Sequence, residues 1–411
     1  MKTQRMYDLD WLRVIAIVLV LYFHVAMIFT ADWEFHIKNN ELSNLWLEFN
    51  YWLSRFRMPL LFFISGVGSH FALKKRSGWV FLKERHHRLV IPLIFSMLVI
   101  VPPQIFIERI FEGEAYASFF EFYPTTLEFI PYPEGNFSWH HMWFVCYLFC
   151  YSLIALPIFL ALRSEKGKHF IAHRLLWLAK STNSYLLFLP TVILYLSWTI
   201  HFNRTNNLIA DWGWFPYWFM FFLVGYIVAT RSAFWESIKR NRKISLKFAV
   251  LCIVILNYLR WNSADYAFIW TAERWSFGLS YLYYGCEPLA AWFWLFAIVG
   301  YGRAYLNKPS KFLSYANEGI YPFYILHQTV LIVIGYYVIQ VEESIAAKYI
   351  FISTLSLFLT VALYEFGIRP YGVMRFLFGM KSPFKPLSKM PNKTLNNSIK
   401  HVENKPVKAE M

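Results

Sequence analysis

Residues 7–29, YDLDWLRVIAIVLVLYFHVAMIF, decide the fold because they form an apolar run of membrane-spanning length. A helix needs about 20 apolar residues to cross the hydrocarbon core of a bilayer, which is about 30 Å thick. Two ionisable side chains, Arg13 and His24, lie eleven residues apart in this run. In a helix that spacing places them about 20° apart on one face and about 16 Å apart in depth. Such groups usually face the interior of a helix bundle or a wet cavity.

The composition of the whole chain supports a membrane protein. Of 411 residues, 57% are hydrophobic, 21% aromatic and 16% charged, whereas soluble domains are about 25% charged. The net charge is +15, and the basic residues lie between apolar runs. We therefore expect no nucleic-acid partner and predict that the lipid bilayer surrounds the protein. All four cysteines lie inside apolar runs, which excludes a disulfide framework and a CxxC metal pair.

Ten apolar segments predict an all-α, polytopic integral membrane protein with about 10 transmembrane helices. They cover roughly 11–30, 56–73, 89–107, 141–162, 185–201, 214–230, 248–262, 276–300, 317–340 and 348–366. Lys and Arg gather in connections 74–88, 163–180 and 231–247, while 108–138 carries six Glu and one Arg. The positive-inside rule therefore places both termini in the cytoplasm.

The chain divides into a transmembrane domain, 1–380, and a basic tail, 381–411. The tail has seven Lys and four Pro, so we predict a disordered cytoplasmic segment. It either binds anionic lipid or only adds solubility. Charged residues interrupt the first apolar run and no cleavage site follows, so we predict a retained helix and not a signal peptide.

Several polar side chains are candidates for function. Asp10 lies one turn before Arg13 and is expected to orient its guanidinium group. Arg85 and Arg88 share a face at the cytoplasmic surface and suit phosphate, because guanidinium groups bind oxyanions bidentately. The alternative is that these arginines only extend toward the interface, and that His24 only bonds a neighbouring helix.

Deeper positions add further candidates. His327 is expected at a depth similar to that of His24, and Glu287 lies beside Pro288 in the middle of a span, where it needs a partner. Either residue acts in function or locks helix packing. His141 and Trp143 lie at the outer mouth, where Trp143 equally suits the interfacial belt. No HExxH or Cys/His spacing is present, so no metal is predicted.

The order of these motifs resembles one family. The first helix, with Arg13 and His24, is similar to that of the bacterial acyltransferase 3 family, and FRMPLLFFISG, RHHR, HHMWFV and YPFYILHQ continue the resemblance. Up to about residue 145 the chain also resembles the glucan biosynthesis protein C branch, whose members succinylate glucans. The tail shows no such resemblance.

The resemblance implies a bacterial inner-membrane enzyme that transfers acetyl or succinyl from cytoplasmic acyl-coenzyme A to a hydroxyl of an extracytoplasmic glycan. No cofactor is expected to stay bound. Arg13, Arg85 and Arg88 would hold the donor's phosphates. His24 would be the catalytic base or nucleophile, supported by His327, Glu287 or Asp10. His141, Trp143 and Arg57 are the acceptor-side candidates. No oligomeric state follows from the sequence.

Two alternatives come from other classes. A secondary transporter or proton-coupled channel would also place ionisable groups and proline-broken helices inside the membrane. A noncatalytic scaffold would leave the spacing of Arg13 and His24 without a purpose.

Overall fold

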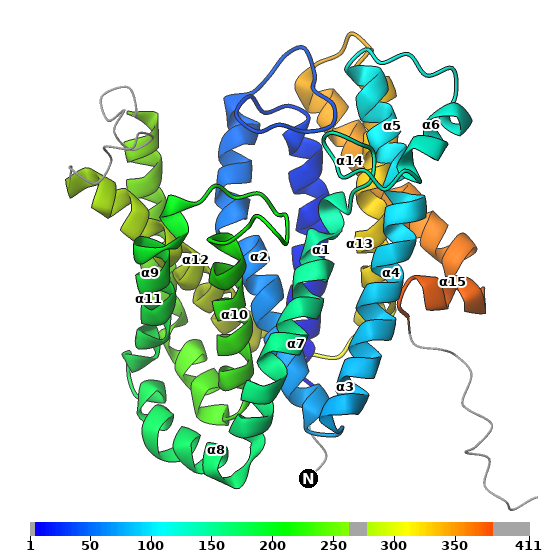
Figure 1. Ribbon diagram of the computed structural model, residues 1–411. Helices are drawn as coiled ribbons and strands as arrows, with labels where there is room; N and C mark the ends of the chain where they lie inside the picture. Colours follow the sequence, from blue (N-terminus) through cyan, green and yellow to red (C-terminus); the bar gives the residue numbers. More distant parts are fainter. Residues whose placement is uncertain (1–4, 263–277, 381–411) are drawn as a thin grey trace, which may run out of the picture.

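The computed structural model describes residues 5–262 and 278–380, and throughout these ranges the regular structure is helical, as predicted (Figure 1). The helices are α1 (Tyr7–Met27), α2 (Asn44–Leu73), α3 (Gly78–Arg85), α4 (Ile91–Phe95), α5 (Pro102–Phe111), α6 (Phe119–Thr126), α7 (Trp143–Arg163), α8 (Glu165–Phe170), α9 (Leu189–Ser197), α10 (Trp214–Ala229), α11 (Ser232–Trp261), α12 (Gly278–Tyr305), α13 (Lys311–Val338), α14 (Ile345–Ala362) and α15 (Gly372–Leu377). Short 3-10 or π-helical turns join several of them.

The described helices confirm a multi-pass membrane protein. Nine helical segments in these ranges are long and apolar enough to cross a bilayer. The predicted segment 214–230 is also an apolar helix, α10, but it has only 16 residues. The predicted tail, 381–411, lies outside the described residues.

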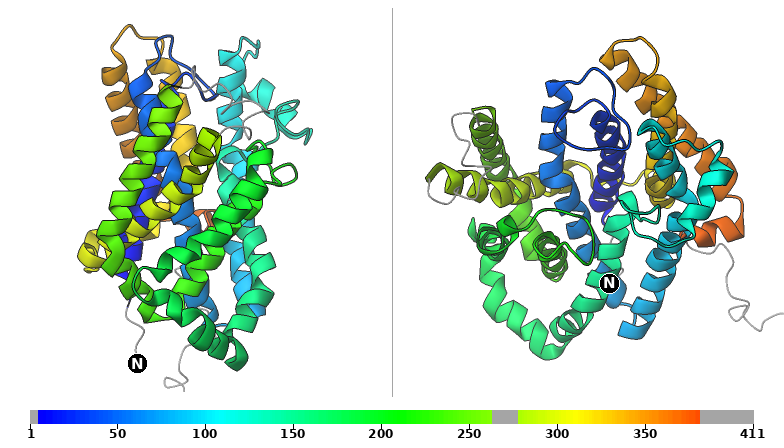
Figure 2. Two further views of the ribbon diagram at one scale, coloured as in Figure 1. Left: turned by 90° about the vertical axis from the view of Figure 1, so that its left-hand side faces the viewer. Right: turned by 45° about the horizontal axis from the view of Figure 1, so that its top comes forward.

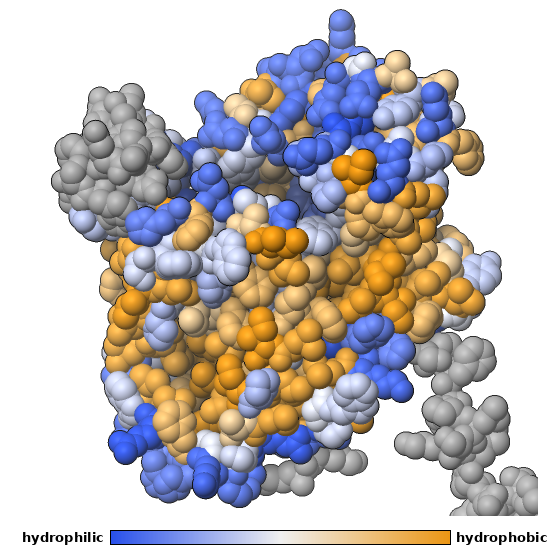
Figure 3. Space-filling view, viewed as in Figure 1, coloured by the Kyte–Doolittle hydropathy of each residue, from blue (hydrophilic) through white to orange (hydrophobic). Residues whose placement is uncertain are grey.

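The helices form a bundle in which most long axes run in roughly one direction (Figure 2). An apolar band crosses the molecular surface between two hydrophilic ends (Figure 3). We call one end the basic end, because connections 74–77, 164–182 and 230–231 lie there. The other is the acidic end, where the segment 112–139 carries five Glu.

We expect the basic end to face the cytoplasm, because Lys and Arg in short connections set membrane orientation. Lys75 and Glu128 are exposed at the basic and acidic ends, respectively. On intact cells, a membrane-impermeant maleimide should label Glu128→Cys and spare Lys75→Cys. Both should react after the cells are permeabilised. Strong labelling of Lys75→Cys in intact cells would reverse the orientation.

The third span, Gly78–Phe111, is not one regular helix. π-helical turns at His86–Val90 and Ser96–Ile100 interrupt it before prolines. Pro102 and Pro103 have no N–H to donate to the carbonyl of Leu98. The hydroxyl of Tyr123 donates to that carbonyl instead, over 3.1 Å. Helix α6 therefore packs on the irregular part of the span.

Helix α1 lies inside the bundle, where it packs against α2, α12, α13 and α14. On its other side, α2 is fixed to α10 by two glycines. A Cβ atom on Gly66 would lie 2.0 Å from the carbonyl oxygen of Phe222, and one on Gly225 would lie 2.1 Å from that of Phe63. Only glycine permits this close approach of the two backbones. The helix that carries Arg13 and His24 thus lies beside a tightly packed pair.

Candidate active site

The structure brings together His24 of α1 and His327 of α13. Nδ1 of His24 lies 3.0 Å from Nε2 of His327, and the two rings stack 5.2 Å apart. His327 is fully buried, whereas His24 is half-buried. The sequence predicts that these two residues lie at a similar depth, and the structure shows that they are also in direct contact.

The hydrogen-bond partners assign the tautomers of both rings. Nδ1 of His327 lies 2.6 Å from the carbonyl oxygen of Tyr324, which only accepts. His327 thus carries its proton on Nδ1, and its Nε2 accepts a hydrogen bond from Nδ1–H of His24. The lone pair of His24 is then on Nε2, which has no hydrogen-bond partner among the described residues. That atom is able to accept a proton or attack a carbonyl carbon.

An arginine with unused donors lies beside this pair. Arg57 of α2 is 6% exposed, and its Nε and one Nη have no hydrogen-bond partner among the described residues. Its guanidinium lies 3.5 Å from the centre of the Phe23 ring, next to His24 in the chain. A buried guanidinium with free donors is suited to an anion or a developing oxyanion. Arg57 therefore lies beside the histidine pair, and its acceptor-side role stays a prediction.

The other two acceptor-side candidates have different positions. His141 packs its ring 5.4 Å from that of His327, and its Nε2 donates to the carbonyl oxygen of Ile325 over 3.0 Å. It thus belongs to the histidine cluster. Trp143 is buried in an aromatic group, with the guanidinium of Arg204 5.5 Å from its ring. Its described contacts are those of a packing residue.

Polar residues that the sequence analysis did not identify extend the cluster toward the acidic end. Nε2 of Gln328 donates to Oε1 of Gln104 and to Nε2 of His36, each over 3.1 Å. His36 in turn contacts the carboxylate of Glu108. Gln328 directly follows His327, and Gln104 directly follows two prolines in an apolar run. These neighbouring residues were the features of the sequence that could have identified Gln328 and Gln104 as candidates.

Two groups at the acidic end have shifted proton affinities because of their surroundings. The hydroxyl of Tyr132 donates to Glu108 over 2.6 Å. Burial and this carboxylate raise the pKa of Tyr132, which keeps it a donor. Lys38 donates to the carbonyl oxygens of Met27 and Thr30 over 2.8 and 2.6 Å, while burial lowers its pKa to about 8. Lys38 thereby closes the end of α1 and orders the loop that carries His36.

The predicted phosphate-binding arginines meet near the basic end. Arg13, Arg85 and Arg88 lie close enough to repel one another electrostatically. Arg85 donates to the hydroxyl of Ser69 over 2.8 Å, and Arg88 donates to the carbonyl oxygen of Gly379 over 3.3 Å. Three cations held together without an ion pair on Arg85 or Arg88 among the described residues suit a polyanion.

Two supporting candidates are placed differently from the expectation. Glu287 pairs with Arg55 and accepts from the hydroxyl of Tyr195 over 2.5 Å. It joins α12 to α2 and α9, and His327 takes the place beside His24. Asp10 lies 2.7 Å from Arg5 and 3.9 Å from Arg13. It lies about 21 Å along the helix from His24, so it supports arginines only.

Fold and site together define a multi-pass helical membrane protein with a histidine pair between a basic and an acidic end. A family model described as an acyltransferase domain matches residues 6–365, and the chain belongs to this acyltransferase 3 family. The protein is thus a multi-pass membrane protein of that family.

Similar curated proteins include glucans biosynthesis protein C of Escherichia coli strain K12 and of Escherichia coli O6:K15:H31 strain 536. Each is 28% identical over 166 residues, which cover 39% of this chain and 41% of the relative. The match therefore spans about two fifths of the length of these relatives. No solved structure matches the chain.

Proposed function

We propose that the protein transfers a short acyl group, acetyl or succinyl, from acyl-coenzyme A at the basic end to a glycan hydroxyl at the acidic end. The bacterial inner membrane is the proposed location, which gives the donor access from the cytoplasm. The observation that carries this proposal is the contact between Nδ1 of His24 and Nε2 of His327, because it assigns the lone pair of His24 to Nε2, between the cationic cluster and the acidic end.

The donor half of the proposal rests on the three arginines. Coenzyme A carries several phosphates, and Arg13, Arg85 and Arg88 offer adjacent guanidinium groups. Arg13 and His24 share one helix, about 16 Å apart along its axis. A pantetheine arm of comparable length would extend along α1 and bring the thioester carbon to Nε2 of His24.

The chemical step follows from the contacts of His24. As general base, Nε2 takes the proton of the acceptor hydroxyl while its oxygen attacks the thioester carbon. Arg57 would stabilise the oxyanion that forms. Collapse of the intermediate breaks the C–S bond, and the thiolate of coenzyme A takes the proton. In a second route, Nε2 attacks the thioester carbon first, the C–S bond breaks, and coenzyme A leaves as the thiolate. The acyl group stays on the imidazole until the acceptor oxygen attacks it, which breaks the acyl–nitrogen bond and passes the hydroxyl proton to Nε2.

Purified protein incubated with radiolabelled acetyl- or succinyl-coenzyme A tests the proposal. We expect saturable donor binding, and transfer of the label to a glycan fraction. A single turnover without acceptor separates the two routes, because only the nucleophilic route leaves an acid-labile acyl group on the protein. A transporter or a scaffold would release no coenzyme A under either condition.

Replacing Arg85 and Arg88 together by Lys should weaken donor binding about tenfold, because Lys keeps the charge and loses the bidentate geometry. Insertion and expression should not change, since the charge of the connection is preserved. Equilibrium binding of labelled acyl-coenzyme A measures the effect. Arg174→Lys, an exposed residue at the same end, is the matched control. Equal affinity of the double variant and the parent would make Arg85 and Arg88 mere interfacial anchors.

A further inference from the structure

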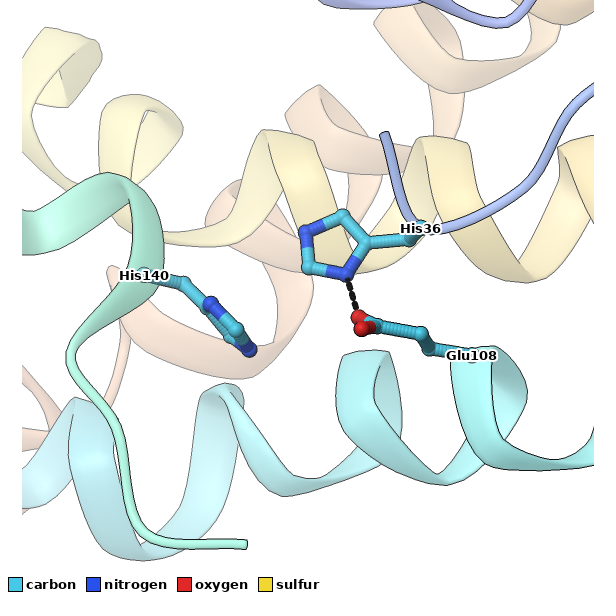
Figure 4. Close-up of side chains that lie close together, drawn as sticks. All are labelled: His36, Glu108 and His140. Atoms are coloured by element: carbon cyan, nitrogen blue, oxygen red, sulfur yellow. Dashed lines mark hydrogen bonds and ion pairs between the residues drawn. The ribbon is translucent and has the colours of Figure 1, made fainter. Parts of the chain in front are cut away.

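Three side chains that can bind a metal ion meet at the acidic end, outside the proposed acyl-transfer site (Figure 4). They are His36 in the loop after α1, Glu108 near the end of α5, and His140 just before α7. One nitrogen or oxygen atom from each lies within 4.8 Å of the other two. Three separate segments thus contribute one potential ligand apiece.

The imidazole ring of His140 points toward this group (Figure 4). Its Nε2 is buried and has no hydrogen-bond partner among the described residues. Its ring lies 4.7 Å from the ring of His36 and 4.9 Å from that of Tyr132. The backbone of His140 has a φ of +37°, a strained value for a residue with a side chain. Strain of this kind persists where surrounding structure requires it, often at functional sites.

Neighbouring residues offer the hydrogen bonds that usually orient metal ligands. The hydroxyl of Tyr132 donates to Oε1 of Glu108 over 2.6 Å, which orients the carboxylate. When Nδ1 of a histidine binds a metal, its Nε2 carries a proton and needs an acceptor. Oε1 of Gln328 is buried and has no hydrogen-bond partner within 5–262 and 278–380, and Nε2 of the same amide already contacts Nε2 of His36. Turning the amides of Gln328 and Gln104 over together would provide the acceptor and keep the hydrogen bond between the two residues.

We propose that His36, Glu108 and His140 form a zinc site. Two imidazoles and one carboxylate are an established ligand set for Zn²⁺. Ligands about 2.0–2.2 Å from a tetrahedral zinc lie about 3.3 Å apart, so the cluster needs only small side-chain movements. Binding releases protons from the ligands to solvent. The ion would join the loop after α1, α5 and the start of α7 around the outer mouth of the histidine cluster.

The full-length protein, purified with a tag that lacks histidine and washed with EDTA, tests this site. All samples carry His173→Ala, because the rings of His169 and His173 lie 4.0 Å apart and form a competing pair. After equilibration with Zn²⁺ and removal of the excess, elemental analysis should find about one zinc per chain. Zinc should also raise the melting temperature of this protein.

Glu108→Gln and His140→Ala should lose the bound zinc and the rise in melting temperature. Glu128→Gln removes an exposed carboxylate at the same end and should keep both. Co²⁺ in place of Zn²⁺ should give the visible absorption of tetrahedral coordination in the unaltered site, which does not depend on the folding of a variant. Unchanged zinc content in both variants, or no tetrahedral Co²⁺ spectrum, would overturn the proposal. Acyl transfer is not part of either measurement.

Discussion

His24→Gln should lower the rate of acyl transfer by about three orders of magnitude, within the range expected for loss of a general base. Glutamine keeps a hydrogen-bonding group near His327 but accepts no proton at neutral pH. Donor affinity should remain close to that of the parent, because the proposed phosphate contacts lie about 16 Å away along α1. Transfer rates with labelled acyl-coenzyme A, and equilibrium binding of the same donor, measure the two effects separately.

His173→Gln is the matched control, since it is the same substitution at an exposed position of the basic end. Its activity should equal that of the parent. A His24→Gln protein that transferred acyl groups at the parental rate would reduce His24 to a packing residue. The pair with His327 would then be a helix-to-helix contact only, which is the alternative that the sequence leaves open for His24.

Arg57→Met should lower the maximal transfer rate about a hundredfold and should leave the protein no less stable. The rate falls because the proposed oxyanion loses its donor, and removal of one such donor typically costs about 10²–10³-fold. Stability is maintained because a buried charge with unused donors is costly in the folded state, and methionine fills a similar volume without that cost. Steady-state kinetics and thermal melting of the detergent-solubilised protein measure the two quantities.

A purely structural role of Arg57 predicts the opposite pair of results. Its contact with the ring of Phe23 would be lost, the melting temperature would fall, and transfer would decline only with the folded fraction. Arg57→Lys adds a further distinction. Lysine keeps the positive charge and a hydrogen-bond donor, so this variant should recover part of the rate that Arg57→Met loses. Full activity of Arg57→Met would remove this residue from the proposed mechanism.

The first helix shows what the sequence was able to predict. Its apolar length predicts a span, and helical geometry places Arg13 and His24 on one face, because both rules act within a single segment. The structure has that helix, with His24 facing the bundle interior. The depth of His327 was predicted for the same reason. Its contact with His24 depends on how α1 and α13 pack, which depth alone does not specify.

Glu287 shows the limit of that reasoning. Its depth is suitable, but α12 presents it to Arg55 and Tyr195, on a different side of the bundle. Position along the membrane normal carries no information on lateral neighbours. His36 and Glu108 were missed for a related reason, since they meet through the path of a loop and an irregular span. A spacing rule such as HExxH finds metal ligands only when they share one helix.

The glycine contact between α2 and α10 bears on how substrates meet. Transporters expose a site to alternate sides by rocking one group of helices against another. Here the backbones of α2 and α10 touch at Gly66 and Gly225. Sliding α10 along α2 would push the carbonyl oxygens of each helix against side chains of the other. The helix pair behind His24 therefore acts as a fixed wall. In such a stationary framework the proposed donor and acceptor would have to reach the histidine from opposite ends, either together or one after the other with the acyl group held on the imidazole in between.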